Sequence, residues 1–108
     1  DAFGKLLYYG SEKATLPKNI RIFNKEGDAY GFLTDVSYFV DFDKKVEFML
    51  SATIYCNSDG ILNDDKYDYE TVGLPFMKQL GRTIYDFELK RKRNFEPNLY
   101  GFKIKYDK

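Results

Sequence analysis

Histidine and tryptophan are absent from the 108 residues, and cysteine occurs once, as Cys56. Without histidine the chain cannot form a Ser-His-Asp triad, an imidazole general base or a histidine-ligated metal site. A single cysteine cannot form a disulfide within the chain. Because no imidazole can activate it, we expect Cys56 to be a packed thiol.

An excess of one charge and long apolar runs are also missing. The 17 Lys and Arg residues balance 17 Asp and Glu residues, so the formal net charge is zero. No global field therefore attracts nucleic acid or an anionic membrane. The apolar runs are too short to cross a bilayer, and no targeting signal is visible. We expect no nucleic-acid partner and no membrane span.

Aromatic residues are unusually abundant: ten Tyr and ten Phe make up 19% of the chain. Such side chains favour strands and fill cores or interfaces. A chain of this length is expected to form one domain, residues 1–108, with a single modest core.

Alternating apolar and polar residues predict three strands, at 19–26, 29–42 and 46–57. Gly27 and Asp28 provide turn chemistry between the first two strands, and the polar stretch 42–45 provides it between the second and third. Short links of this kind predict an antiparallel meander. Weaker patterns suggest further short strands at 5–9 and 99–106.

Helical spacing replaces this alternation near residue 69, and predicts one long helix at 69–92. Its apolar stripe consists of Val72, Phe76, Leu80, Ile84 and Phe87, with Met77 beside it. Small residues at 73 and 81 weaken the helix intrinsically but allow it to lie close to a sheet. The expected fold class is therefore α+β, with an antiparallel sheet of three main strands and the helix packed on one face. The basic run 90–93 suits a helix C-terminus, and the alternative is contact with phosphate or lipid headgroups.

The triplet Lys25-Glu26-Gly27 is the main candidate for chemistry. By itself it is a weak motif, because any strand followed by a polar turn can contain it. The residues around it, "NKEGDAYGFLTD", extend the pattern into the next strand. Together with the later strand, polar loop and helix, this order resembles the C-terminal segment of the β-lactamase and penicillin-binding serine hydrolases. More narrowly, residues 16–89 resemble class A β-lactamase-related serine hydrolases of the kind common in Bacteroidetes.

The resemblance implies roles for several residues. Lys25 would match the Lys of the Lys-Thr-Gly triplet that ends the strand lining the active site, where its charge supports the catalytic proton network and the substrate carboxylate. Gly27 would match the Gly of that triplet, which lets backbone and substrate approach closely. The backbone N–H of Asp28 would be the strand donor of the oxyanion hole. Thr34 and Asp35 would match a pair of polar residues on the following strand, whose role in the family is structural rather than catalytic. The class uses neither a metal nor an organic cofactor, and acts in the periplasm or cell envelope.

Glu26 departs from the family pattern, in which a hydroxyl helps to hold a substrate carboxylate. Two carboxylates about 4 Å apart, at an effective dielectric near 20, repel each other by about 4 kcal/mol. Hydrolysis of an ordinary β-lactam is therefore not expected.

The family's Ser-x-x-Lys nucleophile and Ser-Asp-Asn triplet do not occur in this sequence. An oxyanion donor without a nucleophile cannot perform acyl transfer, so we expect this chain to be inert by itself. The expected partner is the missing N-terminal part of the same protein, or a second copy bound through the exposed aromatic sheet face. The alternative function is a small, aromatic-rich α+β binding module of the cell envelope.

Overall fold

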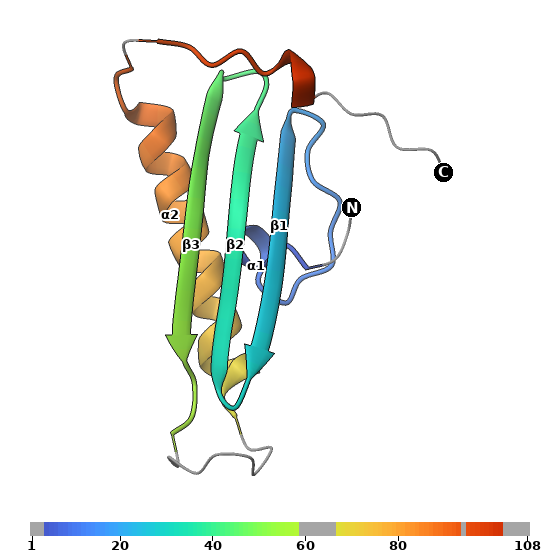
Figure 1. The fold of residues 1–108 in the computed structure, drawn as a ribbon, viewed down its shortest axis with the longest axis vertical. Coiled ribbons are helices and arrows are strands. Elements are labelled where there is room, and N and C mark those ends of the chain that lie inside the picture. Colours follow the sequence, from blue (N-terminus) through green and yellow to red (C-terminus); the bar gives the residue numbers. More distant parts are fainter. Residues whose placement is uncertain (1–3, 59–66, 94, 103–108) are drawn as a thin grey trace.

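The computed structural model describes residues 4–58, 67–93 and 95–102 (Figure 1). In chain order they form helix α1 (Leu6–Tyr9) and strands β1 (Ile20–Ala29), β2 (Phe32–Asp41) and β3 (Val46–Tyr55). A π-helical turn (Tyr69–Gly73) then leads into helix α2 (Leu74–Lys90), and a 3₁₀ turn follows at Tyr100–Phe102. The α+β class, the three predicted strands and the long helix are confirmed.

The three strands form one antiparallel sheet in the order β1-β2-β3. Pairing is continuous, from Ile20 opposite Asp41 to Ala29 opposite Phe32. The turn predicted at Gly27 and Asp28 is wrong, because β1 runs through both residues. The chain instead reverses at Tyr30 and Gly31, whose φ angles of 51° and 93° are both positive. This two-residue geometry follows the right-handed twist of the flanking strands.

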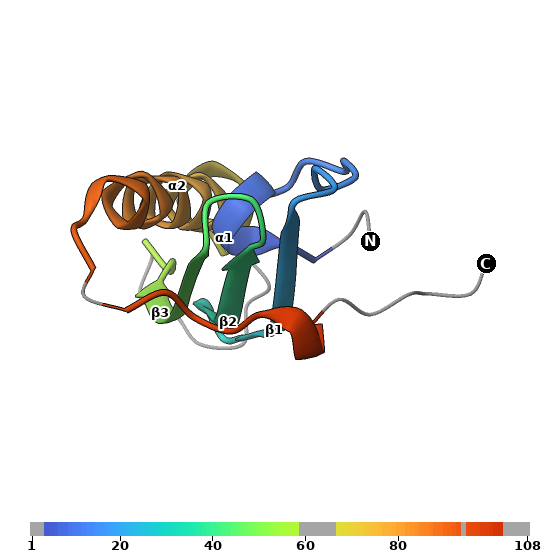
Figure 2. The ribbon, with the colours of Figure 1, turned by 90° about the horizontal axis from the view of Figure 1, so that it is seen from above.

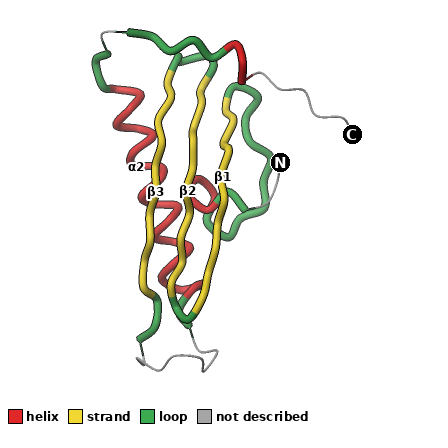
Figure 3. The backbone as a smooth tube through the Cα atoms, in the orientation of Figure 1, coloured by secondary structure: helices red, strands yellow, loops and turns green. Residues whose placement is uncertain are grey.

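Both helices cover the same face of the sheet (Figures 1 and 2). On the opposite face, the segment that follows α2 crosses one end of the strands, and the tube in Figure 3 traces its path. The largest buried side chains belong mainly to the helix-covered layer and include Phe39, Leu7 and Met77. The other sheet face is open over most of its length, with Met49 74% exposed.

Helix α1 occupies part of the segment where a short strand was suggested at 5–9, and that suggestion is wrong. The helix packs across α2, where the Arg82 guanidinium lies 3.7 Å from the centre of the Tyr8 ring and donates a hydrogen bond to the Tyr8 carbonyl oxygen. Tertiary contacts override the strand preference of neighbouring tyrosines here. The possible last strand at 99–106 is a 3₁₀ turn at its start, and its remainder lies outside the described residues.

The buried face of α2 differs from the predicted stripe. Val72, Phe76 and Phe87 are exposed, whereas Met77 and Gly81 are buried. The helix turns Gly81 inward because the backbone of α1 passes close to it. A Cβ on Gly81 would lie 1.5 Å from the carbonyl oxygen of Leu7, so α1 touches the α2 backbone at this point.

Candidate functional site

The site predicted from sequence lies on β1, which is an edge strand of the sheet. The Phe42 N–H donates to the Asn19 carbonyl, so Asn19 directs its backbone groups toward β2. Along an antiparallel strand, successive residues direct their N–H and C=O groups alternately toward the partner strand and away from it. The pairing of β1 with β2 is unbroken as far as Ala29, so this alternation continues to the end of β1. Glu26 and Asp28 therefore direct their N–H and C=O groups away from β2, along the outer edge of the sheet.

Two contacts of the neighbouring residues support this assignment. The Ile20 N–H donates to the Pro17 carbonyl, and the Ile22 carbonyl accepts a 2.9 Å hydrogen bond from the Lys5 ammonium. Both contacts are made from the outer side of β1, as expected for even-numbered residues. The first half of the edge is thus engaged by residues earlier in the chain.

The predicted residues Lys25, Gly27 and Asp28 are all exposed. The Lys25 ammonium donates a 2.7 Å hydrogen bond to the Glu26 carbonyl oxygen, which holds the charge beside the strand edge. Apart from its two chain neighbours, none of the residues that the structure describes has a heavy atom within 4 Å of a Cβ built on Gly27, so the space over this position is open. The structure brings the cation and the outward Asp28 N–H to one accessible edge.

The Glu26 side chain is exposed and lies on the helix-covered side of the sheet. Its carboxylate accepts a 3.4 Å hydrogen bond from the Asn24 side-chain amide, and a Cβ on Gly4 would lie 3.2 Å from it. The edge therefore carries a carboxylate where an anionic substrate group would have to approach.

A buried polar cluster lies directly behind this edge. Asn24 is its centre: its amide nitrogen donates to the Gly4 carbonyl at 2.6 Å and to the Asp35 carboxylate at 3.0 Å. Its amide oxygen accepts a 2.8 Å hydrogen bond from the Lys5 ammonium. The Ser37 hydroxyl donates to the other Asp35 oxygen at 3.1 Å. The cluster anchors the N-terminal segment to β1 immediately before the Lys25 position.

Burial raises the pKa of the Asp35 carboxyl group, and the hydrogen bonds from Asn24 and Ser37 offset part of that rise. The expectation of a structural role for Asp35 agrees with this fully buried position. Thr34, its neighbour, points to the open face and shares a hydrogen bond with Thr53. Sequence reasoning missed Lys5 and Ser37, although a polar residue at the core-facing position 24 was a signal that buried polar partners would be needed.

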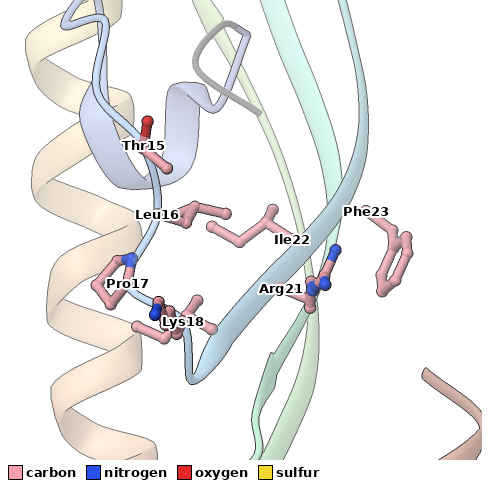
Figure 4. A pocket seen from close by; sticks show the side chains of 8 residues that line it. Thr15, Leu16, Pro17, Lys18, Arg21, Ile22 and Phe23 are labelled. Carbon is pink, nitrogen blue, oxygen red and sulfur yellow. The ribbon is translucent and has the colours of Figure 1, made fainter. Parts of the chain in front are cut away.

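A groove of about 410 Å³ follows the first half of the same edge (Figure 4). It lies between the segment Thr15–Lys18 and the start of β1, and Figure 4 shows Leu16 and Ile22 meeting across it. The side chains lining it are mostly apolar, with Lys18 and Arg21 as the charged members. The groove ends before the Lys25–Asp28 stretch, so the two features share the strand but not their residues.

Other candidates for chemistry are poorly placed. Cys56 is buried, and desolvation raises the pKa of its thiol, which disfavours the reactive thiolate. Within residues 4–58, 67–93 and 95–102, no group of three or more acidic or cysteine side chains is arranged to hold a metal ion. The same residues include no helix with the length and apolarity needed to cross a bilayer.

The chain matches no protein-family model, no curated protein and no solved structure.

Proposed function

We propose that this chain provides the sheet side of a serine-hydrolase active site of the β-lactamase and penicillin-binding type. The observation that carries the proposal is the open outer edge of β1. The backbone N–H of Asp28 points outward from this edge, and the exposed Lys25 lies three residues before it in the chain. A strand N–H directed at an open edge can donate to a developing oxyanion, and a nearby ammonium stabilises negative charge.

The nucleophile of the proposed site would come from outside these residues. No serine in the chain is followed by lysine three residues later. Ser37 is fully buried and donates to Asp35, while Ser51 lies on the open sheet face, away from the edge. Without a serine and its activating base beside the Asp28 N–H, the chain alone is inert in acyl transfer.

The substrate of the intact site is proposed to be an amide or ester of peptide character, and its compartment the periplasm or cell envelope. Glu26 argues against substrates that place a carboxylate at this point of the edge. Its side chain is exposed beside the outward backbone groups, so a second carboxylate would be repelled there.

Acyl-probe labelling tests the proposal. A fluorescent penicillin and a fluorophosphonate would be incubated with this chain and with the product of the complete encoding gene. We expect no label on the 108 residues, and label on a serine of a Ser-x-x-Lys motif encoded upstream of Asp1. Labelling of Ser11, Ser37, Ser51 or Ser58 would contradict the proposal.

Substitution of Lys25 tests the edge itself. In the labelled gene product, Lys25→Ala should lower the acylation rate by about a hundredfold, the scale expected for loss of one group stabilising the oxyanion. Lys13→Ala removes an equal charge from an exposed position on the loop before β1 and should leave the rate unchanged. Equal acylation rates for the Lys25→Ala and Lys13→Ala variants would show that Lys25 does not belong to the site.

A second candidate function is binding through the open sheet face. Phe32 and Tyr55 are each about half exposed, with ring centroids 4.6 Å apart, and Met49 is mostly exposed. Exposed aromatic side chains on a rigid sheet are effective anchors for a protein, glycan or peptide. A glycan or peptide array in which Tyr55→Ser abolishes binding, together with a gene encoding no Ser-x-x-Lys motif, would favour this function over the hydrolase.

A further inference from the structure

The end of the sheet opposite the Tyr30–Gly31 turn gathers cations from three separate segments. The register places Ile20, Asp41 and Val46 side by side, so the start of β1 and the β2–β3 turn lie together. Helix α2 ends there too, and an Arg93 guanidinium nitrogen lies 3.4 Å from the Lys44 carbonyl oxygen. We call this surface the basic end; its cations are Lys18, Lys44, Lys45, Lys90, Arg91, Lys92 and Arg93.

The zero net charge of the whole chain conceals this local excess. Seven cations share the basic end with four acidic residues at its surface, namely Asp43, Glu47, Glu88 and Glu96. Glu88 pairs with Arg91 at 2.9 Å, and its carbonyl accepts from Arg93. Among the described residues, no ion pair or hydrogen bond engages the exposed side chains of Lys44, Lys45 or Lys92. These three ammonium groups are available to an external anion.

Two aromatic side chains accompany these cations. Phe95 and Tyr100 are 85% and 82% exposed, the highest values among the large hydrophobic residues that the structure describes. Both belong to the segment that crosses the basic end in Figures 1 and 2. Phe95 also lines an open groove of about 460 Å³, whose other lining residues are Arg91, Lys92, Arg93, Pro97, Glu47 and Glu96. An apolar ring is thus held in water directly beside positive charge.

We propose that the basic end docks on the surface of a bilayer containing anionic phospholipids. The lysines lie against the headgroup phosphates, and Phe95 enters the boundary between headgroups and acyl chains. Aromatic residues beside lysines and arginines favour this boundary, and each cation near an anionic surface adds to the attraction. A polynucleotide requires a long row of phosphate contacts, and the three lysines without partners among the described residues, Lys44, Lys45 and Lys92, provide few of them. The inference is independent of the proposed hydrolase function.

Vesicle co-sedimentation tests the inference with the chain as it stands. We expect binding to vesicles of phosphatidylcholine and phosphatidylglycerol in a two-to-one ratio, weakening as salt is added, and none to pure phosphatidylcholine. Lys44→Glu with Lys92→Glu should weaken binding at least about tenfold. Lys13→Glu with Lys78→Glu makes the same charge change away from the basic end and should bind like the parent. Lys13 is exposed and Lys78 pairs with Glu12 at the surface, so we expect this control to remain folded, which circular dichroism would check.

Insertion of the Phe95 ring into the bilayer can be followed separately by fluorescence. The chain contains no tryptophan, so a tryptophan introduced at one position gives the only indole signal. In a Phe95→Trp variant, anionic vesicles should shift the emission to shorter wavelength, whereas Phe76→Trp on α2 should not respond. Equal binding to neutral vesicles, unchanged binding of the Lys44 and Lys92 double variant, or no shift at position 95 would overturn the inference. Salt-sensitive binding to a single-stranded oligonucleotide with none to vesicles would overturn it in favour of nucleic acid.

Discussion

The Asn24 side-chain amide donates a 3.0 Å hydrogen bond to the Asp35 carboxylate, joining β1 to β2 on the helix-covered face of the sheet. Through the same side chain, Lys5 and the Gly4 carbonyl are held against β1. The first residue of the candidate edge, Lys25, therefore follows directly after the best-anchored polar residue of the strand. The open edge is fixed from behind by the buried Lys5 and Asp35 side chains and the partly buried Asn24.

Asp35 should tolerate an amide far better than an apolar side chain. Asp35→Leu leaves the Asn24 amide and the Ser37 hydroxyl without their acceptor, and should cost about 2–4 kcal/mol of unfolding free energy. Asp35→Asn keeps an acceptor for Asn24, and the Ser37 hydroxyl can turn to accept from the new amide. We expect it to remain within about 1 kcal/mol of the parent in urea denaturation at neutral pH.

The same pair of proteins gives a pH test. Burial raises the pKa of Asp35, so its contribution to stability is fully present below the unfolded pKa and is lost as pH rises through the folded value. The stability of Asp35→Asn relative to the parent should therefore increase from acid to neutral pH. A constant difference across that range would contradict the raised pKa.

Asp41 should behave in the opposite sense. Burial alone would raise its pKa, but hydrogen bonds from Tyr85, Asn19 and the backbone N–H groups of Lys44 and Asp43 outweigh burial and lower it. A lowered pKa contributes stability above the unfolded value, and this stability is lost as pH falls through the folded value. Tyr85→Phe should cost about 1–3 kcal/mol at neutral pH and less in acid. Tyr9→Phe removes a hydroxyl that bonds the Thr15 carbonyl at the surface, and serves as the control.

Gly81 should be intolerant of any side chain. Because a Cβ there would lie 1.5 Å from the Leu7 carbonyl oxygen, Gly81→Ala must separate α1 from α2 and should cost about 3 kcal/mol or more. Gly27→Ala enters open space on β1 and should change the unfolding free energy by less than about 1 kcal/mol. Thermal unfolding of the two variants measures the difference, and similar midpoints would exclude close packing of the helices.

Tyr30 is poorly suited to its turn. Its φ of 51° lies in the left-handed region, and the residue is 54% exposed. Tyr30→Asn creates the Asn-Gly sequence that this two-residue turn prefers, and should raise the unfolding free energy by about 1 kcal/mol. A lower melting temperature would mean that the Tyr30 ring makes a contact worth more than the strain.

The open sheet face should drive self-association of the isolated chain. Val36 and Met49 present exposed apolar side chains at its centre. Sedimentation velocity should detect a concentration-dependent dimer that Val36→Lys with Met49→Lys abolishes. Val72→Lys, at an equally exposed position before α2, should leave the dimer intact. A parent that stays monomeric at high concentration would exclude this interface.

Local patterns predicted the elements that depend on local forces. β-branched and aromatic residues in alternation located all three strands, and the polar stretch 42–45 located the second turn. The first turn was misplaced because Gly27 and Asp28 are common turn residues, whereas Tyr30 is not. Pairing with β2 extends β1 through Gly27 and Asp28 as far as Ala29. Of the two residues in the actual turn, only Gly31 is of a type that commonly adopts a positive φ.

The sequence by itself determined the α+β class, the three strands and the long helix, because these follow from periodicity within short windows. Tertiary structure alone decided which face of α2 is buried, that α1 is a helix, and that Lys5 meets Asn24 behind the edge. Each of these depends on contacts between segments far apart in the chain, such as Tyr8 with Arg82. Burial and hydrogen-bond partners are set by where such segments pack, and no local pattern contains that information.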